Sequence, residues 1–167
     1  MTFRTIGEHV RVEIDRIKAS RFIADAAPIE SAAQAAAFLE DVRAEYPDAS
    51  HHCWAWRLLG EETRSSDDGE PSGSAGKPIL NRIVGAEIEN AVVVVTRYFG
   101  GTKLGTGGLV RAYGAAAQAA LDAAPFIERE PTVEMTIAYD YALSGAVKSV
   151  FAKYDVEPTH ATYDTRI

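Results

Sequence analysis

The chain has 167 residues, with 17 Lys and Arg against 24 Asp and Glu, which gives a formal net charge of −7. This length predicts one domain with at most a small appendage, and the single cysteine, Cys53, excludes an intrachain disulfide. Apolar runs such as residues 91–95 are far shorter than the about 20 residues of a membrane-spanning helix. We therefore expect a cytoplasmic protein with no membrane partner, and one too acidic to coat nucleic acid through bulk charge.

The first third of the chain predicts a β-hairpin followed by a helix. Apolar residues alternate along residues 7–17 at strand period, and residues 20–29 form a second extended segment, so the turn falls near Lys18-Ala19. Ser31 is the expected N-cap of a helix that continues to Tyr46.

The middle of the chain alternates strand and helix patterns around a long polar segment. Residues 51–59 and 91–96 are strand-like, and the second of these is apolar throughout, which is typical of an interior strand. Residues 61–76 are expected to form a loop that is unusually long for a compact domain, followed by a helix over residues 77–87.

The last third begins with a glycine-rich segment and ends in a small β-α-β pattern. A helix is expected over residues 109–124, and a domain boundary in residues 125–131. Beyond it, residues 131–139 and 156–163 predict strands that flank a helix over residues 143–154. This piece is too small for a core of its own.

Three stretches carry the most specific information. The first is Lys18-Ala-Ser-Arg-Phe-Ile23, and the second joins His51-His-Cys-Trp-Ala-Trp56 to the polar loop at residues 67–78. The third, residues 97–113, reads Arg-Tyr-Phe-Gly-Gly-Thr-Lys-Leu-Gly-Thr-Gly-Gly-Leu-Val-Arg-Ala-Tyr. At these residues the sequence resembles the IMPACT family, in particular its bacterial branch, over about residues 1–125.

The resemblance implies an α+β fold. Its main domain, expected at residues 1–125, would be a βα sandwich of the superfamily that includes a small-subunit ribosomal protein domain, RNase PH and the GHMP kinases. Residues 131–167 would be part of a ferredoxin-like module similar to domain V of elongation factor G. The family's eukaryotic namesake is linked to translational control through a protein partner of a stress kinase, and RNA or ribosome association is the usual inference for bacterial members.

The glycine block, defined here as residues 97–111, lies between an apolar strand and a helix, where backbone N–H groups can face an anion. It matches neither a P-loop nor the dinucleotide fingerprint. An alternative is that its glycines only permit tight packing. The expected anion-binding residues are Arg97, Tyr98, Gly100, Gly101, Lys103, Gly105, Gly107, Gly108 and Arg111.

A second set of polar residues is expected to line a cleft beside this block: Ser20, Arg21, His52, Asp68 and Glu70. The carboxylates of the 65–73 loop do not have EF-hand spacing, and two adjacent histidines beside Cys53 are too few for a zinc site. On a strand, His51 and Cys53 share one face and His52 lies on the other, which favours a buried and inert cysteine. We therefore expect no metal and no cofactor, and no catalytic residue is assigned.

Three functions fit these residues. The first is a translation-associated regulatory protein that binds RNA, the ribosome or another anion through the glycine block. The second is an enzyme for a small phosphorylated substrate, with a pocket lined by His52, Asp68, Arg97 and Lys103. The third is a protein-interaction domain without a ligand. The absence of a nucleophile–base pair ranks the enzyme below the binding protein, and the sequence leaves the oligomeric state open.

Overall fold

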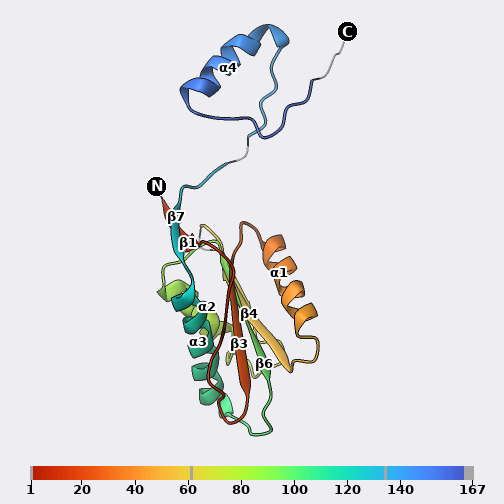
Figure 1. Cartoon of the computed structure of the whole chain (residues 1–167), viewed down its shortest axis with the longest axis vertical. Helices are drawn as coiled ribbons and strands as arrows, with labels where there is room; N and C mark the ends of the chain where they lie inside the picture. Colours follow the sequence, from red (N-terminus) through yellow and green to blue (C-terminus); the bar gives the residue numbers. More distant parts are fainter. Residues whose placement is uncertain (1, 61, 134, 164–167) are drawn as a thin grey trace. The chain divides into compact units, whose positions relative to one another are not determined.

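The computed structural model describes residues 2–60, 62–133 and 135–163, and the chain divides into two compact units, residues 1–131 and 132–167. The first unit is a mixed α+β domain built on a five-stranded antiparallel sheet (Figure 1). In spatial order its strands are β2 (Val10–Glu13), β3 (Arg21–Pro28), β6 (Ala91–Tyr98), β4 (His51–Arg57) and β5 (Thr63–Ser66).

The strands lie where their sequence patterns predict, with one addition. The β2–β3 hairpin turns at Lys18 and Ala19, both with positive φ, as expected. The apolar strand β6 is the middle strand, flanked by β3 and β4 and buried along almost its whole length. The addition is β5, an exposed edge strand in the segment expected to be loop, which its polar sequence did not indicate.

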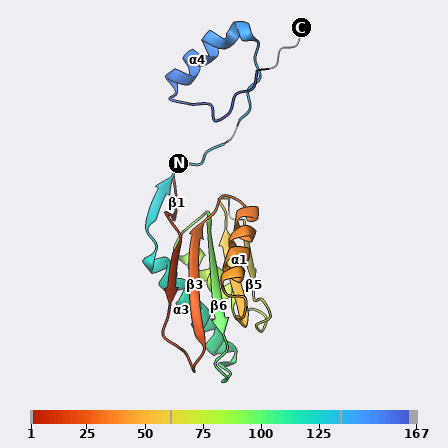
Figure 2. The ribbon, with the colours of Figure 1, turned by 45° about the vertical axis from the view of Figure 1, so that its right-hand side comes forward.

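Three helices cover the two faces of the sheet (Figures 1 and 2). Helix α1 (Ala32–Glu45) lies on one face and begins as expected at Ser31, whose hydroxyl accepts a hydrogen bond from the backbone N–H of Gln34 at 3.2 Å. Helices α2 (Gly76–Gly85) and α3 (Gly105–Ala123) pack side by side on the opposite face. Helix α3 begins four residues earlier than expected, because its first turn is made of glycine-block residues with low helix propensity.

The alternation of side chains along each strand separates two hydrophobic cores. The larger core lies between the sheet and α2 with α3, and β6 contributes Val93 and Val95 to it. The smaller core lies between the sheet and α1, and β6 contributes Val92 and Val94. The parity of a strand residue therefore tells which face of the sheet its side chain occupies.

A buried carboxylate ties the edge of the sheet to α1. Asp25 on β3 has no exposed side-chain surface, and one of its oxygens accepts hydrogen bonds from His9 Nε2 at 2.7 Å and Arg11 Nε at 2.8 Å. Arg11 continues to Glu45 at the end of α1 through a two-pronged ion pair. This network fixes the α1 side of the domain and leaves the other face to α2 and α3.

Two short strands that the sequence did not predict close the domain. β1 (Phe3–Ile6) and β7 (Phe126–Arg129) pair in antiparallel register, with Ile6 opposite Phe126. They bring the start of the chain against the residues that follow α3.

The second unit holds a 3-10 turn, η1 (Tyr141–Leu143), and helix α4 (Ser144–Lys153). The helix agrees with the prediction. The strands predicted over 131–139 and 156–163 were wrong, because the structure has no strand among the described residues of either segment. Their alternating side chains, such as Val133 and Met135, are largely exposed, and alternation alone does not supply the neighbouring strand that a β-ladder needs.

None of the described helices is long and apolar enough to cross a membrane.

Gly100 of the glycine block packs directly against the backbone of the β2–β3 hairpin. A Cβ at this position would stand 2.2 Å from the carbonyl carbon of Ala19 and 2.3 Å from the backbone nitrogen of Ser20. Because backbone atoms cannot move aside cheaply, Gly100→Ala is expected to destabilise the fold by about 1–3 kcal/mol in urea unfolding followed by tryptophan fluorescence. Gly85→Ala is the matched control, since nothing lies within 4 Å of its Cβ position. Equal stability of the two variants would contradict this packing.

Candidate functional site

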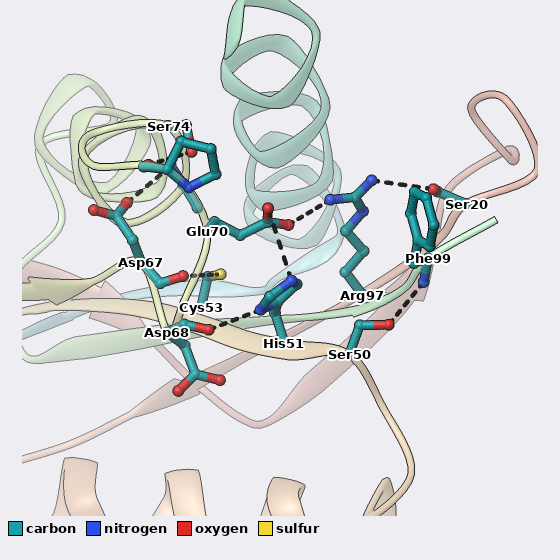
Figure 3. Close-up of polar contacts among 12 residues, drawn as sticks. Ser20, Ser50, His51, Cys53, Asp67, Asp68, Glu70, Ser74, Arg97 and Phe99 are labelled. Carbon is teal, nitrogen blue, oxygen red and sulfur yellow. Dashed lines mark hydrogen bonds and ion pairs between the residues drawn. The ribbon is translucent and has the colours of Figure 1, made fainter. Parts of the chain in front are cut away.

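A buried carboxylate in the loop between β5 and α2 is the centre of a polar cluster. The side chain of Glu70 is 4% exposed, and its Oε1 accepts a hydrogen bond from Arg97 Nη1 at 2.6 Å (Figure 3). The same oxygen accepts a second hydrogen bond from the Tyr113 hydroxyl at 2.7 Å. Arg97 is the penultimate residue of the central strand β6 and is itself 5% exposed, while Tyr113 lies in α3. Glu70 therefore joins the loop to both the sheet and the helix.

Ser20 extends this cluster to the hairpin and the glycine block. Its hydroxyl oxygen accepts a hydrogen bond from Arg97 Nη2 at 3.3 Å and another from the backbone N–H of Gly100 at 3.1 Å. The backbone N–H of the preceding residue, Phe99, donates to the Ser50 hydroxyl at 2.9 Å (Figure 3). The start of the glycine block is thus held on both sides by short polar side chains.

His51 lies beside Arg97 on the same face of the sheet and is oriented by the loop. Its Nδ1 lies 2.8 Å from the carbonyl oxygen of Asp68, and because a carbonyl only accepts, Nδ1 carries the proton. Its Nε2 then faces Glu70 Oε2 at 3.8 Å.

Cys53 is not placed to act as a nucleophile. It is fully buried beneath the loop, and its thiol donates to the carbonyl oxygen of Asp67 at 3.0 Å (Figure 3). Burial is the main cause that raises the pKa of Cys53 to about 12, so the thiol stays protonated at neutral pH. Burial likewise raises the pKa of its neighbour Tyr113. The expectation of an inert cysteine agrees with this geometry.

Asp67 caps the N-terminus of α2. Its carboxylate accepts hydrogen bonds from the backbone N–H groups of Gly73 at 2.8 Å, Ala75 at 3.0 Å and Gly76 at 2.8 Å. Burial acts to raise the pKa of Asp67, but these three bonds together outweigh it and the pKa is lowered. The positive end of α2 is therefore satisfied by an ionised side chain of the chain itself.

The N-terminus of α3 has no such carboxylate. Its N-cap residue, Leu104, offers no side-chain hydrogen bond, and the first turn contains no acidic residue. Gly101 and Gly105 both have positive φ, which shapes the exposed loop leading into the helix. Lys103 and Arg111 are exposed nearby. Among the described residues, neither forms an ion pair with a carboxylate.

The structure separates the expected anion-binding residues into two groups. Arg97 faces inward and is engaged by Glu70, and the hydroxyl of Tyr98 donates to Asp48 at 2.8 Å. Gly100 is held against the hairpin. The remaining residues, which are exposed or half-buried around the start of α3, are Gly101, Lys103, Gly105, Gly107, Gly108 and Arg111.

The expected cleft residues do not all meet. Ser20 and Glu70 converge on Arg97, as described. Arg21 pairs with Glu13, at 2.8 Å, and His52 lies on the α1 face of the sheet, opposite to Arg97. Strand alternation explains the difference, because His51 rather than His52 shares the parity of Arg97 in the β4–β6 register.

Asp68 also belongs to the α1 side. Its carboxylate accepts hydrogen bonds from Arg43 of α1 at 3.3 Å and from the backbone N–H of His52 at 2.7 Å. His52, Asp68, Arg97 and Lys103 therefore do not line one pocket, which counts against the enzyme hypothesis. In the described parts of the chain, no three His, Cys, Asp or Glu side chains are grouped so as to hold a metal ion.

Comparison with known proteins places this fold and its glycine block in a family. The model of the Impact N-terminal domain matches residues 18–121, which include the hairpin, the Glu70 loop and the glycine block. The chain belongs to the IMPACT family. IMPACT family member YigZ of Escherichia coli is 40% identical over 155 residues, which cover 90% of this chain and 76% of that protein.

Two further comparisons agree with this membership. A crystal structure of a protein described only as hypothetical is 38% identical, with a TM-score of 0.84, and the match covers 98% of this chain and 81% of the other. The Protein IMPACT homolog of Saccharomyces cerevisiae is 35% identical over 95 residues, which are 53% of this chain and 36% of that protein. The sequence similarity thus extends from a bacterial relative to part of a yeast protein.

Removing the charge of Glu70 is expected to unfold the domain much more easily. Glu70→Gln leaves the Arg97 guanidinium buried without its counter-ion, a change that typically costs about 3–5 kcal/mol of unfolding free energy. Glu13→Gln breaks an exposed pair with Arg21, which solvent screens, and should cost much less stability. Urea unfolding of both variants measures the difference. If the two lose the same stability, Glu70 does not hold the domain together.

Because of His52, we expect the folded domain to lose stability in mild acid. Burial is the main cause that lowers its pKa, so the folded chain resists a proton that the unfolded chain accepts below about pH 6.5. Stability linked to His52 is therefore full above that pH and is lost as the pH falls toward 5. His52→Gln should flatten this dependence in urea unfolding at pH 7 and pH 5. His160→Gln, an exposed control, should leave it unchanged, and identical slopes in all three proteins would refute the assignment.

Proposed function

We propose that this IMPACT family member is a translation-associated regulatory protein that binds RNA through the N-terminus of α3. The proposal rests above all on one observation: the first turn of α3 is exposed, lacks any side-chain cap and lies between Lys103 and Arg111. Family membership supports the association with translation. Cytoplasmic location and the ribosomal-protein-like superfamily of the domain are proposed on the same basis.

The contrast between α2 and α3 supports an anionic ligand from outside the chain. Both helices present backbone N–H groups and the positive end of a helix dipole at their first turns. Asp67 accepts from two N–H groups at the start of α2, those of Ala75 and Gly76, whereas no carboxylate of the described residues caps the start of α3. A phosphate oxygen is a matching acceptor for such N–H groups, and the two cations add charge-assisted bonds.

Phe99 gives the site a surface for a nucleobase. It is 50% exposed, directly precedes the glycines, and its backbone is fixed by Ser50. Exposed aromatic rings beside cations are the usual platform for unpaired bases, because every base has a face that can stack. A phosphate site next to an aromatic ring favours single-stranded RNA over a free phosphorylated metabolite.

Replacing both cations tests the proposal. We expect the wild-type chain to bind a fluorescent single-stranded uridine 12-mer, and Lys103→Gln/Arg111→Gln to bind it at least about tenfold more weakly, with the slope of log affinity against log salt reduced by about 1.4. Lys148→Gln/Lys153→Gln, in the second unit, is the charge-matched control. Arg97 is left unchanged because its loss would disturb the buried ion pair. Equal affinity of the two double variants would refute the proposal.

An added carboxylate should separate binding from stability. Thr106→Asp places an anion in the first turn of α3, where it would cap the free N–H groups and stabilise the helix by about 0.3–1 kcal/mol. The same carboxylate would repel and displace phosphate, so RNA binding measured by fluorescence anisotropy should be lost while the urea midpoint rises or stays constant. Thr106→Asn, which can cap without the charge, should retain most of the binding. If Thr106→Asp binds RNA normally, the ligand does not occupy this helix end.

A further inference from the structure

The groove between α2 and α3 carries a second basic site beyond the helix N-terminus. It contains an open surface cavity of about 130 Å³ lined by Pro78, Asn81, Arg82, Val110 and Gly114. The two helices contain no acidic residue until Asp122, near the far end of α3. In a protein of net charge −7, these two helix segments, residues 76–85 and 105–121, carry the cations Lys77, Arg82 and Arg111 and no acidic residue of their own.

Arg82 is the central group of this groove. Its guanidinium lies against Gly114, 3.4 Å from the position a Cβ would occupy there, so glycine is what lets the side chain lie flat on α3. Six other arginines of the domain, listed next, form ion pairs with carboxylates: Arg11, Arg21, Arg43, Arg57, Arg97 and Arg129. In the described residues Arg82 forms none, and neither do Arg4, Arg16, Arg64 and Arg111. Among these five arginines, Arg82 is the one that lines the α2–α3 cavity.

The basic groups form a track along one face of α3. Gly107, Arg111 and Gly114 are spaced four and three residues apart and so share a helix face. The Arg111 guanidinium lies back toward Gly107, at 3.6 Å from its Cβ position, and Arg82 covers Gly114. From Gly105 to Gly114 the helix rises about 13 Å. At about 3.4 Å per stacked nucleotide this length matches roughly four nucleotides.

We propose that the α2–α3 groove is a second phosphate-binding subsite, centred on Arg82, which extends the α3 N-terminal site into a track for a single-stranded RNA of several nucleotides. This inference rests on the proposed function and specifies its ligand as a chain rather than one phosphate. Arg82 contacts a phosphate about four nucleotides from the one at the helix N-terminus, and Asn81 beside it offers an amide donor and acceptor at the cavity wall.

The test compares a short and a long RNA on matched variants. Arg82→Gln should weaken binding of an adenosine 12-mer, whose bases stack, about three- to tenfold and reduce its salt slope by about 0.7, yet leave an adenosine 3-mer unaffected, because the short RNA fills only the helix N-terminus. Arg64→Gln is the control, since Arg64 is an exposed arginine on the edge strand β5. It should bind both RNAs as wild type does.

The other possible results distinguish failure of the Arg82 subsite from failure of the proposed function. If Arg82→Gln binds the 12-mer as Arg64→Gln does, the subsite is refuted and the proposed function stands. If Arg82→Gln weakens the 3-mer and the 12-mer equally, Arg82 acts at the first site and the track is refuted. If the wild-type chain binds neither RNA at low salt, both the track and the proposed function fail. Displacement of the 12-mer by an acidic peptide at lower concentration than by unlabelled RNA would assign the groove to a protein partner and also overturn the track.

Discussion

The buried ion pair between Glu70 and Arg97 is the interaction on which the other parts of the site depend. Arg97 lies near the end of the central strand, and Glu70 comes from a loop 27 residues earlier, so their contact fixes that loop over the sheet. Tyr113 donates to the same carboxylate and sets α3 against it, while Ser20 links Arg97 to the hairpin. Because the charges are buried, loss of one partner would leave the other uncompensated. The exposed start of α3 is therefore presented from a rigid base.

Much of the main domain could be predicted from local patterns. The hairpin at Lys18-Ala19, the Ser31 cap and the apolar central strand each depend on signals contained within a few residues. What could not be predicted depends on distant partners. β1 and β7 form only because the two ends of the domain meet, and β5 is a polar edge strand paired on one side only. In the second unit, alternation suggested strands that have no neighbour among the described residues.

The site shows the same limit at the level of single side chains. Arg97 lies in a basic and glycine-rich stretch, so sequence alone assigned it to an external anion. The sequence also indicates its internal partner, Glu70, as a cleft residue. Nothing in the sequence, however, fixes the strand register that brings Glu70 and Arg97 together. Strand parity did place His51 and Cys53 on one face correctly. Applied to Arg97 through the β4–β6 register, it would have selected His51 over His52 as its neighbour.

The position of Cys53 makes the loop that covers it observable. It is the one cysteine of the chain and is fully buried. Its thiol donates a hydrogen bond to the backbone carbonyl of Asp67 in that loop. A thiol reagent can reach it only when the loop lifts or the domain opens. The rate at which a reagent labels Cys53 under native conditions therefore measures how often the loop opens. A ligand that holds the loop closed would lower this labelling rate, and a ligand that binds elsewhere would leave the rate unchanged.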